Sequence, residues 1–594
     1  MSNPALSRRD FHRLAGVTIG GMVAKSAAET VAQGVQPGAR RFRLEALTDF
    51  VDDALSTTIT HKHIRSMMQT LRKMGVRRVS WGYYADGRGG FLVPAGLDPR
   101  WRHLADTYHG LGNPLRVAAE AAHACGIELF AYYKPYETGP AVALPDGSPE
   151  ARAFGRVRQR GAWLTWFDPF VVENPHLRIR HRPDDTIAGR ANQKICALRL
   201  VKSDDAPTRV TAEHLAIWSS EFNYRYKPLD VKFSFRDEVI RSPREVRDIN
   251  GTLLTKKGAP VRILTLSGFA LTDPYVLVTT DFAGGPADFA NAGTDLLVAL
   301  DANGKEIPGV FYSGARIYMA NRINFRNWGL LFDCGYGRQK AYLDAPSTSG
   351  HQGCVAFCRG RNAYLPGALC ETEPDVRRFW LACITEMLDA GVDGVDFRVE
   401  NHGTHTEYPA EYGFNDVVLK ECRRRGKTDL RTISKVRGEA YTEFLRAAKR
   451  LIAARGKQMR VNLNIDWFRP DPPPNRRLAY PANIEFDWRR WVDEGLMDEG
   501  ILRMFHLPLN HVFGGDAVTK EMIDRCSKKG IPLTVNRYIN PSSPDEFDRV
   551  RRDARFCGFI MYETASYLRF QPDGGCRVSN NIAAEISRRM ARAE

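Results

Sequence analysis

The chain has 594 residues, of which 43% are hydrophobic and 26% charged, as in ordinary globular proteins, and its length predicts two or three domains. The formal net charge of +16 favours anionic partners, but the basic residues are scattered and no nucleic-acid-binding motif accompanies them, so nucleic acid is not an expected partner. The 11 cysteines include no Cys-x-x-Cys pair, which argues against a disulfide framework.

The pattern of residues 1–34 is typical of a twin-arginine signal peptide. The arginine pair Arg8-Arg9 precedes a short, Gly-rich apolar stretch over 14–24, and small residues follow it. The apolar stretch is too short to span a bilayer. We therefore expect a periplasmic or secreted protein that has no membrane contact once the signal is removed.

From residue 41 onward, amphipathic helical patterns alternate with short apolar strands, and a glycine often separates the two. Glycine just past a helix is the usual C-cap, and the alternation predicts parallel βαβ units. The eight predicted strands are residues 43–50, 79–84, 127–133, 392–397, 459–466, 500–506, 531–537 and 557–563. Eight such units close into a (β/α)₈ TIM barrel, an α/β fold. A doubly wound open sheet is the alternative, although no Gly-x-Gly-x-x-Gly turn supports it.

A long segment, 138–372, separates the third strand from its helix. Residues 138–193 read as an irregular Pro- and Arg-rich connection, whereas alternating runs between about 194 and 344, divided by Asn-Gly turns, predict a β-sandwich-like domain. The barrel is thus expected in two parts, 41–137 and 373–594. Because the third strand ends on the catalytic side of a barrel, we expect the β domain to form one wall of the cleft.

The fourth predicted strand carries Asp396, Arg398 and Glu400 on one face, because residues two apart share a face. Two carboxylates beside a guanidinium inside a barrel are costly to bury unless they serve a polar site. Glycoside cleavage uses one protonated acid and one ionised carboxylate. Arg398 would keep Glu400 ionised, so Glu400 is the expected essential carboxylate. The alternative is a structural ion pair between Arg398 and one of the acids.

The second catalytic carboxylate is expected at another strand end. Asp466 follows two inward amides on the fifth strand, and Glu563 ends the last strand. For Asp466 the alternative is a structural role as the cap of a loop. For Glu563 the objection is that neighbouring residues of a strand point to opposite faces, so we expect that Tyr562 and Glu563 cannot both face inward. Together with Asp396 these residues complete the catalytic candidates.

Aromatic, amide and basic side chains at the strand ends are expected to bind the sugar by stacking and hydrogen bonding. Lys134 and Arg537 would suit an acidic sugar. No cofactor is expected. The substrate-binding candidates are Arg398, His402, Trp81, Tyr83, Tyr132, Lys134, Asn462, Asn464, Trp467, His506, Asn536 and Arg537.

Two close histidine pairs, His61 with His63 and His402 with His405, leave a metal-dependent barrel hydrolase as an alternative. The pairs would converge if the first and fourth strand ends met. Neither forms a His-Glu-x-x-His motif, so no metal ligand is predicted.

Residues 373–380 and 388–398 resemble the glycoside hydrolase-like barrels allied to the α-amylase and α-galactosidase superfamily, in which a Pro-x-Val-Arg-type helix start precedes a Gly-x-Asp-Gly-x-Asp strand. Arg398-Val399-Glu400 matches the spacing of the arginine and nucleophile there, with Glu in place of Asp. The acid-bearing Gly-Glu motif of strand five and the Asn-His-Asp motif of strand seven are missing. The resemblance implies a hydrolase of this broad group, not a true amylase, and hence a carbohydrate substrate and hydrolysis of glycosidic bonds. The net charge and the basic residues Lys134, Arg398 and Arg537 at the strand ends predict a preference for an anionic glycan. A non-catalytic carbohydrate-binding barrel is the alternative.

Overall fold

The computed structural model describes residues 42–592 with internal gaps. The gaps are residues 98, 140–141, 184–191, 203, 248–252, 283–295, 308–309, 313–352, 361, 400–408, 465–482, 504–508 and 510–516. The predicted signal peptide and six predicted or alternative site residues therefore lie outside the described residues: Glu400, His402, His405, Asp466, Trp467 and His506. Among the helices that are described, none has the length and hydropathy needed to cross a membrane.

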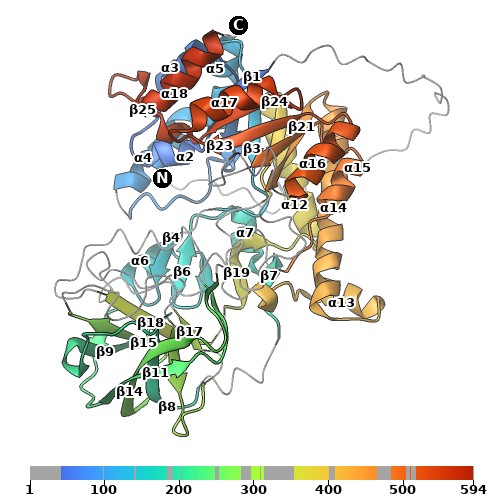
Figure 1. The fold of residues 1–594 in the computed structure, drawn as a ribbon. Coiled ribbons are helices and arrows are strands. Elements are labelled where there is room, and N and C mark those ends of the chain that lie inside the picture. Colours follow the sequence, from blue (N-terminus) through green and yellow to red (C-terminus); the bar gives the residue numbers. More distant parts are fainter. Residues whose placement is uncertain are drawn as a thin grey trace. The chain divides into compact units, whose positions relative to one another are not determined.

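Eight parallel strands close into a barrel in the order β1-β2-β3-β20-β21-β22-β23-β24. Their bounds are Arg43–Thr48, Val76–Gly82, Glu128–Tyr133, Gly394–Phe397, Gln458–Asn464, Glu499–Arg503, Leu533–Tyr538 and Phe556–Tyr562. The first strand, blue in Figure 1, pairs with the last, red, and this pairing closes the sheet. The predicted (β/α)₈ barrel is confirmed, and the open-sheet alternative is wrong because β24 pairs with β1.

Side-chain alternation along the strands separates two environments. On β23, Leu533 and Val535 join the large hydrophobic core, whereas the Thr534 hydroxyl donates to Glu499 inside the barrel. Successive residues of a strand point to opposite faces, so Asn536 shares the inward face with Thr534. The apolar outward positions pack against the helices, whereas the inward positions carry both polar groups and a small apolar cluster that includes Leu47, Ile501 and Ile560.

Helices accompany the barrel strands, as the alternating sequence patterns predicted. Their bounds are α2 Phe50–Ala54, α3 His61–Lys73, α4 Pro99–Leu111, α5 Pro114–Ala124, α12 Pro374–Asp389, α13 Asp416–Arg424, α14 Leu430–Ala454, α15 Trp488–Asp493, α16 Ala517–Lys528, α17 Ser543–Arg552 and α18 Asn581–Ala591. Thr60 caps α3 by accepting from the backbone N–H of His63, and Gly75 follows that helix with φ +87°. That left-handed conformation is the one that glycine adopts at little cost, so Gly75 ends the helix before β2.

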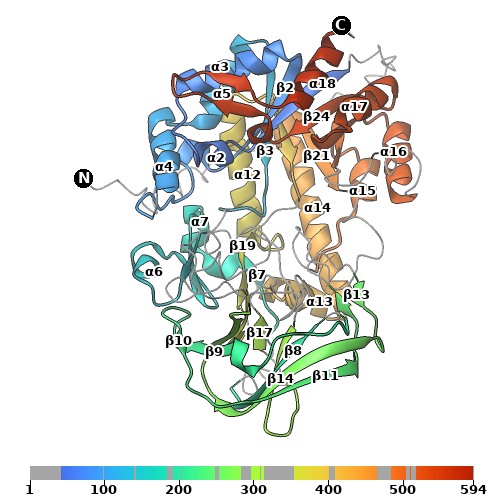
Figure 2. The same cartoon turned by 60° about the vertical axis from the view of Figure 1, so that its left-hand side comes forward.

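Between β3 and α12 the chain forms two antiparallel sheets that share a hydrophobic core, contributed among others by Leu198, Leu264, Ile217 and Val276. One sheet contains β8 Ile195–Val201, β11 Ser234–Arg241, β14 Pro260–Leu271 and β16 Leu296–Leu300. The other contains β9 Leu215–Ser220, β10 Lys227–Pro228, β15 Tyr275–Thr280, β17 Val310–Tyr312 and β18 Gly353–Arg359. Figure 2 shows β8, β11 and β14 in green. The domain boundaries and the cleft-wall role stay predictions.

The connection before these sheets is more regular than its sequence indicated. It contains β4 Val142–Pro145, β5 Val157–Gln159 and β6 Ala162–Thr165 in one small sheet, with α6 Pro149–Phe154 and α7 Pro169–Glu173. Strands of three or four residues are too short to show a hydrophobic alternation, which explains why this segment was expected to be irregular. The remaining short strand pairs are β7 Arg178–Arg180 with β19 Tyr364–Leu369, β12 Val246–Arg247 with β13 Leu253–Thr255, and β25 Leu568–Phe570 with β26 Cys576–Val578.

Candidate active site

The N-terminal end of the barrel interior holds an ion-pair network, which we call the lower layer: Arg43, Glu45, Arg78, Arg460 and Glu499. Arg460 lies 2.8 Å from Glu45 and 3.0 Å from Glu499, and Glu499 also lies 2.6 Å from Arg43 and 3.1 Å from Arg78. Burial favours the neutral form of Glu499, but the arginines outweigh it and lower its pKa to about 2. Both carboxylates are thus surrounded by cations, as in a structural network.

Asp396 lies inside the barrel, as predicted, and is fully buried. It accepts hydrogen bonds from the Ser80 hydroxyl at 3.1 Å and from the side-chain amide of Asn462. Burial raises the pKa of Asp396 to about 6, although Arg460 opposes the shift. Asn462 is inward and fully buried too, and Asn464 lies opposite Arg503 in the strand register. The catalytic role of Asp396 stays a prediction.

The C-terminal end of the interior, which we call the mouth, begins with an ion pair at the ends of β1 and β3. The Lys134 ammonium lies 3.0 Å from Asp49 and 3.3 Å from Glu137, and it donates to the Tyr84 hydroxyl at 2.6 Å. Tyr84 in turn donates to Asp49. Burial favours neutral Asp49, but Lys134 and the Tyr84 hydrogen bond hold its pKa below the ordinary value. Asp49 is therefore an ionised carboxylate at a strand end.

Two arginines meet at one tyrosine in the mouth. Arg398 donates to the Tyr562 hydroxyl at 3.1 Å, and Arg503 donates to the same oxygen at 2.7 Å. Arg503 also donates to the Tyr132 hydroxyl at 2.6 Å. Burial raises the pKa of Tyr562, so this hydroxyl is neutral at pH 7. The structure thus brings the predicted residues Arg398 and Tyr132 together through Arg503, which the sequence analysis missed.

Glu563 also reaches the mouth, because its backbone turns sharply after β24. Its φ is +57°, an uncommon value for a non-glycine residue and one that is found at functional sites. The Tyr538 hydroxyl donates to it at 2.9 Å, and its carboxylate lies within 4.8 Å of those of Asp49 and Asp52. Since Tyr562 faces inward as well, the expectation that only one of the two does so is wrong. Glu563 remains partly exposed.

Three predicted binding residues point away from the barrel interior. Trp81 stacks on Phe50 of α2 with ring centroids 5.1 Å apart, and Tyr83 joins the same hydrophobic core. Arg537 pairs with Glu546 of α17 at 2.9 Å. Each follows an inward residue of its strand, and alternation therefore turns it toward the helices. These three side chains thus lie outside the barrel interior, and their role in sugar binding stays a prediction.

His63, one of the histidines that the metal-dependent alternative could use, has another role. One ring nitrogen of His63 lies 3.0 Å from the Thr60 hydroxyl and the other 2.9 Å from the Gln571 carbonyl oxygen, so the side chain caps α3. Within the described ranges, the metal-ligating side chains that converge are the three acids at the mouth, Asp49, Asp52 and Glu563. Lys134 already supplies a cation to Asp49 there.

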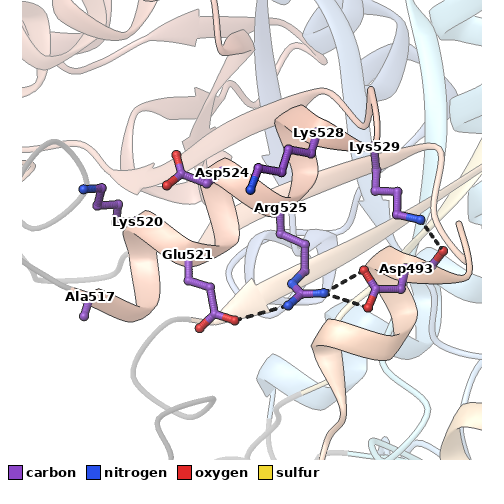
Figure 3. A pocket seen from close by; sticks show the side chains of 8 residues that line it. All are labelled: Asp493, Ala517, Lys520, Glu521, Asp524, Arg525, Lys528 and Lys529. Atoms are coloured by element: carbon purple, nitrogen blue, oxygen red, sulfur yellow. Dashed lines mark hydrogen bonds and ion pairs between the residues drawn. The ribbon is translucent and has the colours of Figure 1, made fainter.

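A surface pocket lies between α15 and α16, away from the inward residues of the strands (Figure 3). Arg525 and Asp493 form an ion pair across it at 2.7 Å, and Lys529 donates to the Asp493 carbonyl at 3.0 Å. None of the predicted site residues lines it. The residues that do are Asp493, Ala517, Lys520, Glu521, Asp524, Arg525, Lys528 and Lys529.

No family model and no curated protein matches the chain. Among solved structures, the catalytic domain of β-amylase from Paenibacillus polymyxa is 8% identical with a TM-score of 0.36, and the alignment covers 94% of this chain and 99% of that one. The glycoside hydrolase domain of PelA from Pseudomonas aeruginosa is 15% identical with a TM-score of 0.20, over 33% of this chain. That of PgaB (BpsB) from Bordetella bronchiseptica is 11% identical with a TM-score of 0.24, over 35% of this chain.

The chain spans 64% of the PelA domain and 62% of the PgaB domain that it matches. Similarities this remote do not identify a function. The closed order of the eight strands itself identifies the barrel.

Proposed function

We propose that this protein is an exported glycoside hydrolase that cleaves glycosidic bonds of a poly- or oligosaccharide by a two-carboxylate mechanism. The observation that carries the proposal is the approach of Glu563 to Asp49 within 4.8 Å, at the C-terminal ends of the last and first strands. That end of a (β/α)₈ barrel is where catalytic groups collect, and glycoside hydrolysis uses paired carboxylates.

The two carboxylates have environments that suit different tasks. Asp49 is ionised beside Lys134 and would stabilise the positive charge that develops on the sugar ring in the transition state. Glu563 is partly exposed at the rim, where a substrate can reach it, and we assign it the proton transfer to the leaving oxygen. Glu400 remains the proposed nucleophile on the sequence argument, with Asp466 as the alternative acid.

An activity screen of the mature protein against neutral, uronic and sulfated glycans tests the proposal. We expect new reducing ends from at least one glycan, and loss of that product in Glu400→Gln. Binding of a glycan without any hydrolysis would instead support the non-catalytic alternative. Because the cation beside Asp49 is a lysine, we expect a chelator to leave activity unchanged. Loss of activity with a chelator, and its recovery with a divalent ion, would favour the metal-dependent hydrolase.

Export is proposed on the arginine pair Arg8-Arg9. Replacing both residues with lysine keeps the charge but removes the motif that the twin-arginine route reads, so we expect the protein to accumulate in the cytoplasm. Unchanged periplasmic accumulation of the double variant would contradict this assignment. The hydrolase proposal does not depend on that outcome.

A further inference from the structure

Hydrogen-bond donors converge in the middle of the mouth. The guanidinium groups of Arg398 and Arg503 both donate to the hydroxyl oxygen of Tyr562, at 3.1 Å and 2.7 Å. Both are almost completely buried, at 4% and 1% exposure. A planar guanidinium presents a fork of donors whose geometry matches the paired oxygens of a carboxylate or sulfate group.

Asn536 adds a donor that has no acceptor in the described part of the chain. It is 2% exposed, and its side-chain nitrogen forms no hydrogen bond there. On β23 it lies directly opposite Arg503 in the strand register, on the inward face that it shares with Thr534. A buried donor left without an acceptor is destabilising, and a ligand oxygen would remove that cost. The unsatisfied amide therefore indicates an acceptor group that arrives with a ligand.

We propose that Arg398, Arg503 and Asn536 form a subsite for the anionic group of a sugar, a uronic carboxylate or a sulfate ester. The identity of the ligand as a sugar rests on the proposed function, whereas the preference for an anion rests on the donors themselves. Burial strengthens the attraction between these cations and an anion, because water screens it less than at the surface. The net charge of +16 would also speed the approach of a polyanionic glycan.

The test measures binding by calorimetry with three probes: a galacturonic acid tetrasaccharide, its carboxyl-reduced neutral counterpart, and that counterpart carrying a sulfate ester. Asn536→Asp keeps the side-chain shape but turns the donor into an anion. Arg503→Lys keeps the charge but removes the fork. Lys528→Gln on α16, in the surface pocket of Figure 3, is the matched control, because it changes the net charge by the same amount as Asn536→Asp.

We expect the wild type to bind one anionic probe at least about tenfold more tightly than the neutral one, the effect of one good charge-assisted contact. Asn536→Asp should lose that preference and keep its affinity for the neutral probe. Arg503→Lys should weaken anion binding by about tenfold, and Lys528→Gln should bind as the wild type does. Which anionic probe binds better then separates a uronic from a sulfated glycan.

Equal affinity for the neutral and anionic probes would overturn the subsite. So would an equal loss of anion binding in Lys528→Gln and Asn536→Asp, because it would show attraction by overall charge alone. If Asn536→Asp does not fold, the affinity of Arg503→Lys for the anionic probes tests the subsite in its place. Tight anion binding without hydrolysis would refute the hydrolase and leave the subsite intact, whereas hydrolysis of neutral glycans without an anion preference would refute only the subsite.

Discussion

At the N-terminal end of the barrel interior, Glu45 and Glu499 hold Arg43, Arg78 and Arg460 in ion pairs, whereas at the C-terminal end Arg398 and Arg503 donate to a tyrosine hydroxyl. Arginine thus has two uses inside one barrel. In the lower layer every arginine faces a carboxylate of the same chain, and the layer has the character of a structural core. The mouth combines arginines with neutral hydroxyls, an unsatisfied amide and a strained glutamate, which is an arrangement suited to a ligand.

The largest effect is expected from breaking the lower layer. Glu499→Leu removes the carboxylate that Arg43, Arg78 and Arg460 share, and it leaves buried charges uncompensated. We expect the free energy of unfolding to fall by about 3–5 kcal/mol, measured by urea denaturation. Activity per folded molecule should persist, because the change lies at the far end of the strands from the mouth.

The exposed glutamate Glu494, which pairs with Arg446 at 2.6 Å, provides the control for this prediction. Glu494→Leu should cost less than about 1 kcal/mol, as is usual for surface pairs. Equal destabilisation by Glu494→Leu and Glu499→Leu would show that the lower layer is not the structural element inferred here.

At the mouth the comparison predicts the reverse result, loss of activity without loss of stability. Glu563→Gln keeps the shape and the hydrogen bond from Tyr538 but removes the acid, so turnover should fall at least about 100-fold, roughly 3 kcal/mol of barrier. The measurement is kcat on the glycan found by the activity screen, with thermal unfolding in parallel. Glu585→Gln on α18 is the control. Near wild-type turnover in Glu563→Gln would leave Asp466 as the acid to test.

Asp396, between the two ends of the interior, should make stability depend on pH. Its pKa rises from an ordinary 3.8 to about 6 on folding, so the folded protein favours the protonated form. This preference stabilises the folded protein fully below about pH 4, and the stabilisation is lost as pH rises through 6. Between pH 4 and pH 6 the free energy of unfolding should fall by about 2 kcal/mol from this group. Asp396→Asn should remove this part of the slope in the unfolding free energy, whereas Asp524→Asn on the surface of α16 should not. Identical slopes in Asp396→Asn and the wild type would contradict the assignment.

The sequence predicted the barrel because its determinants are local. Each amphipathic helix, glycine and apolar strand repeats within a short stretch, and all eight predicted strands overlap those observed, with bounds that differ by one to three residues at most ends. The main exception at the fold level is the small sheet of β4, β5 and β6, whose strands carry too few residues for a periodic pattern.

The candidate site was predicted only in part, because side-chain direction depends on register. Extending the inward face of β1 from Glu45 by two residues at a time reaches Asp49, a signal that was present but not used. Arg503 was missed because apolar residues occupy both faces of its strand just before it, at Ile501 and Leu502. Trp81 was assigned to the mouth for its residue type, although its neighbour Ser80 holds the inward position. The turn that brings Glu563 inward has no signature in the sequence.

The smallest effect is expected at the surface pocket between α15 and α16, which contrasts with both ends of the barrel interior. Arg525 and Asp493 are 2.7 Å apart, as close as the buried pair of Arg460 and Glu45, but their side chains are 32% and 47% exposed. Water and salt screen such a pair, and ordering two mobile side chains offsets part of the attraction. We therefore expect Arg525→Gln to lower the free energy of unfolding by less than about 1 kcal/mol and to keep full activity. In about 1 M salt the variant and the wild type should be equally stable. A loss of stability as large as that expected for Glu499→Leu would show that this ion pair is a structural element, and a fall in turnover would show that the pocket takes part in the activity.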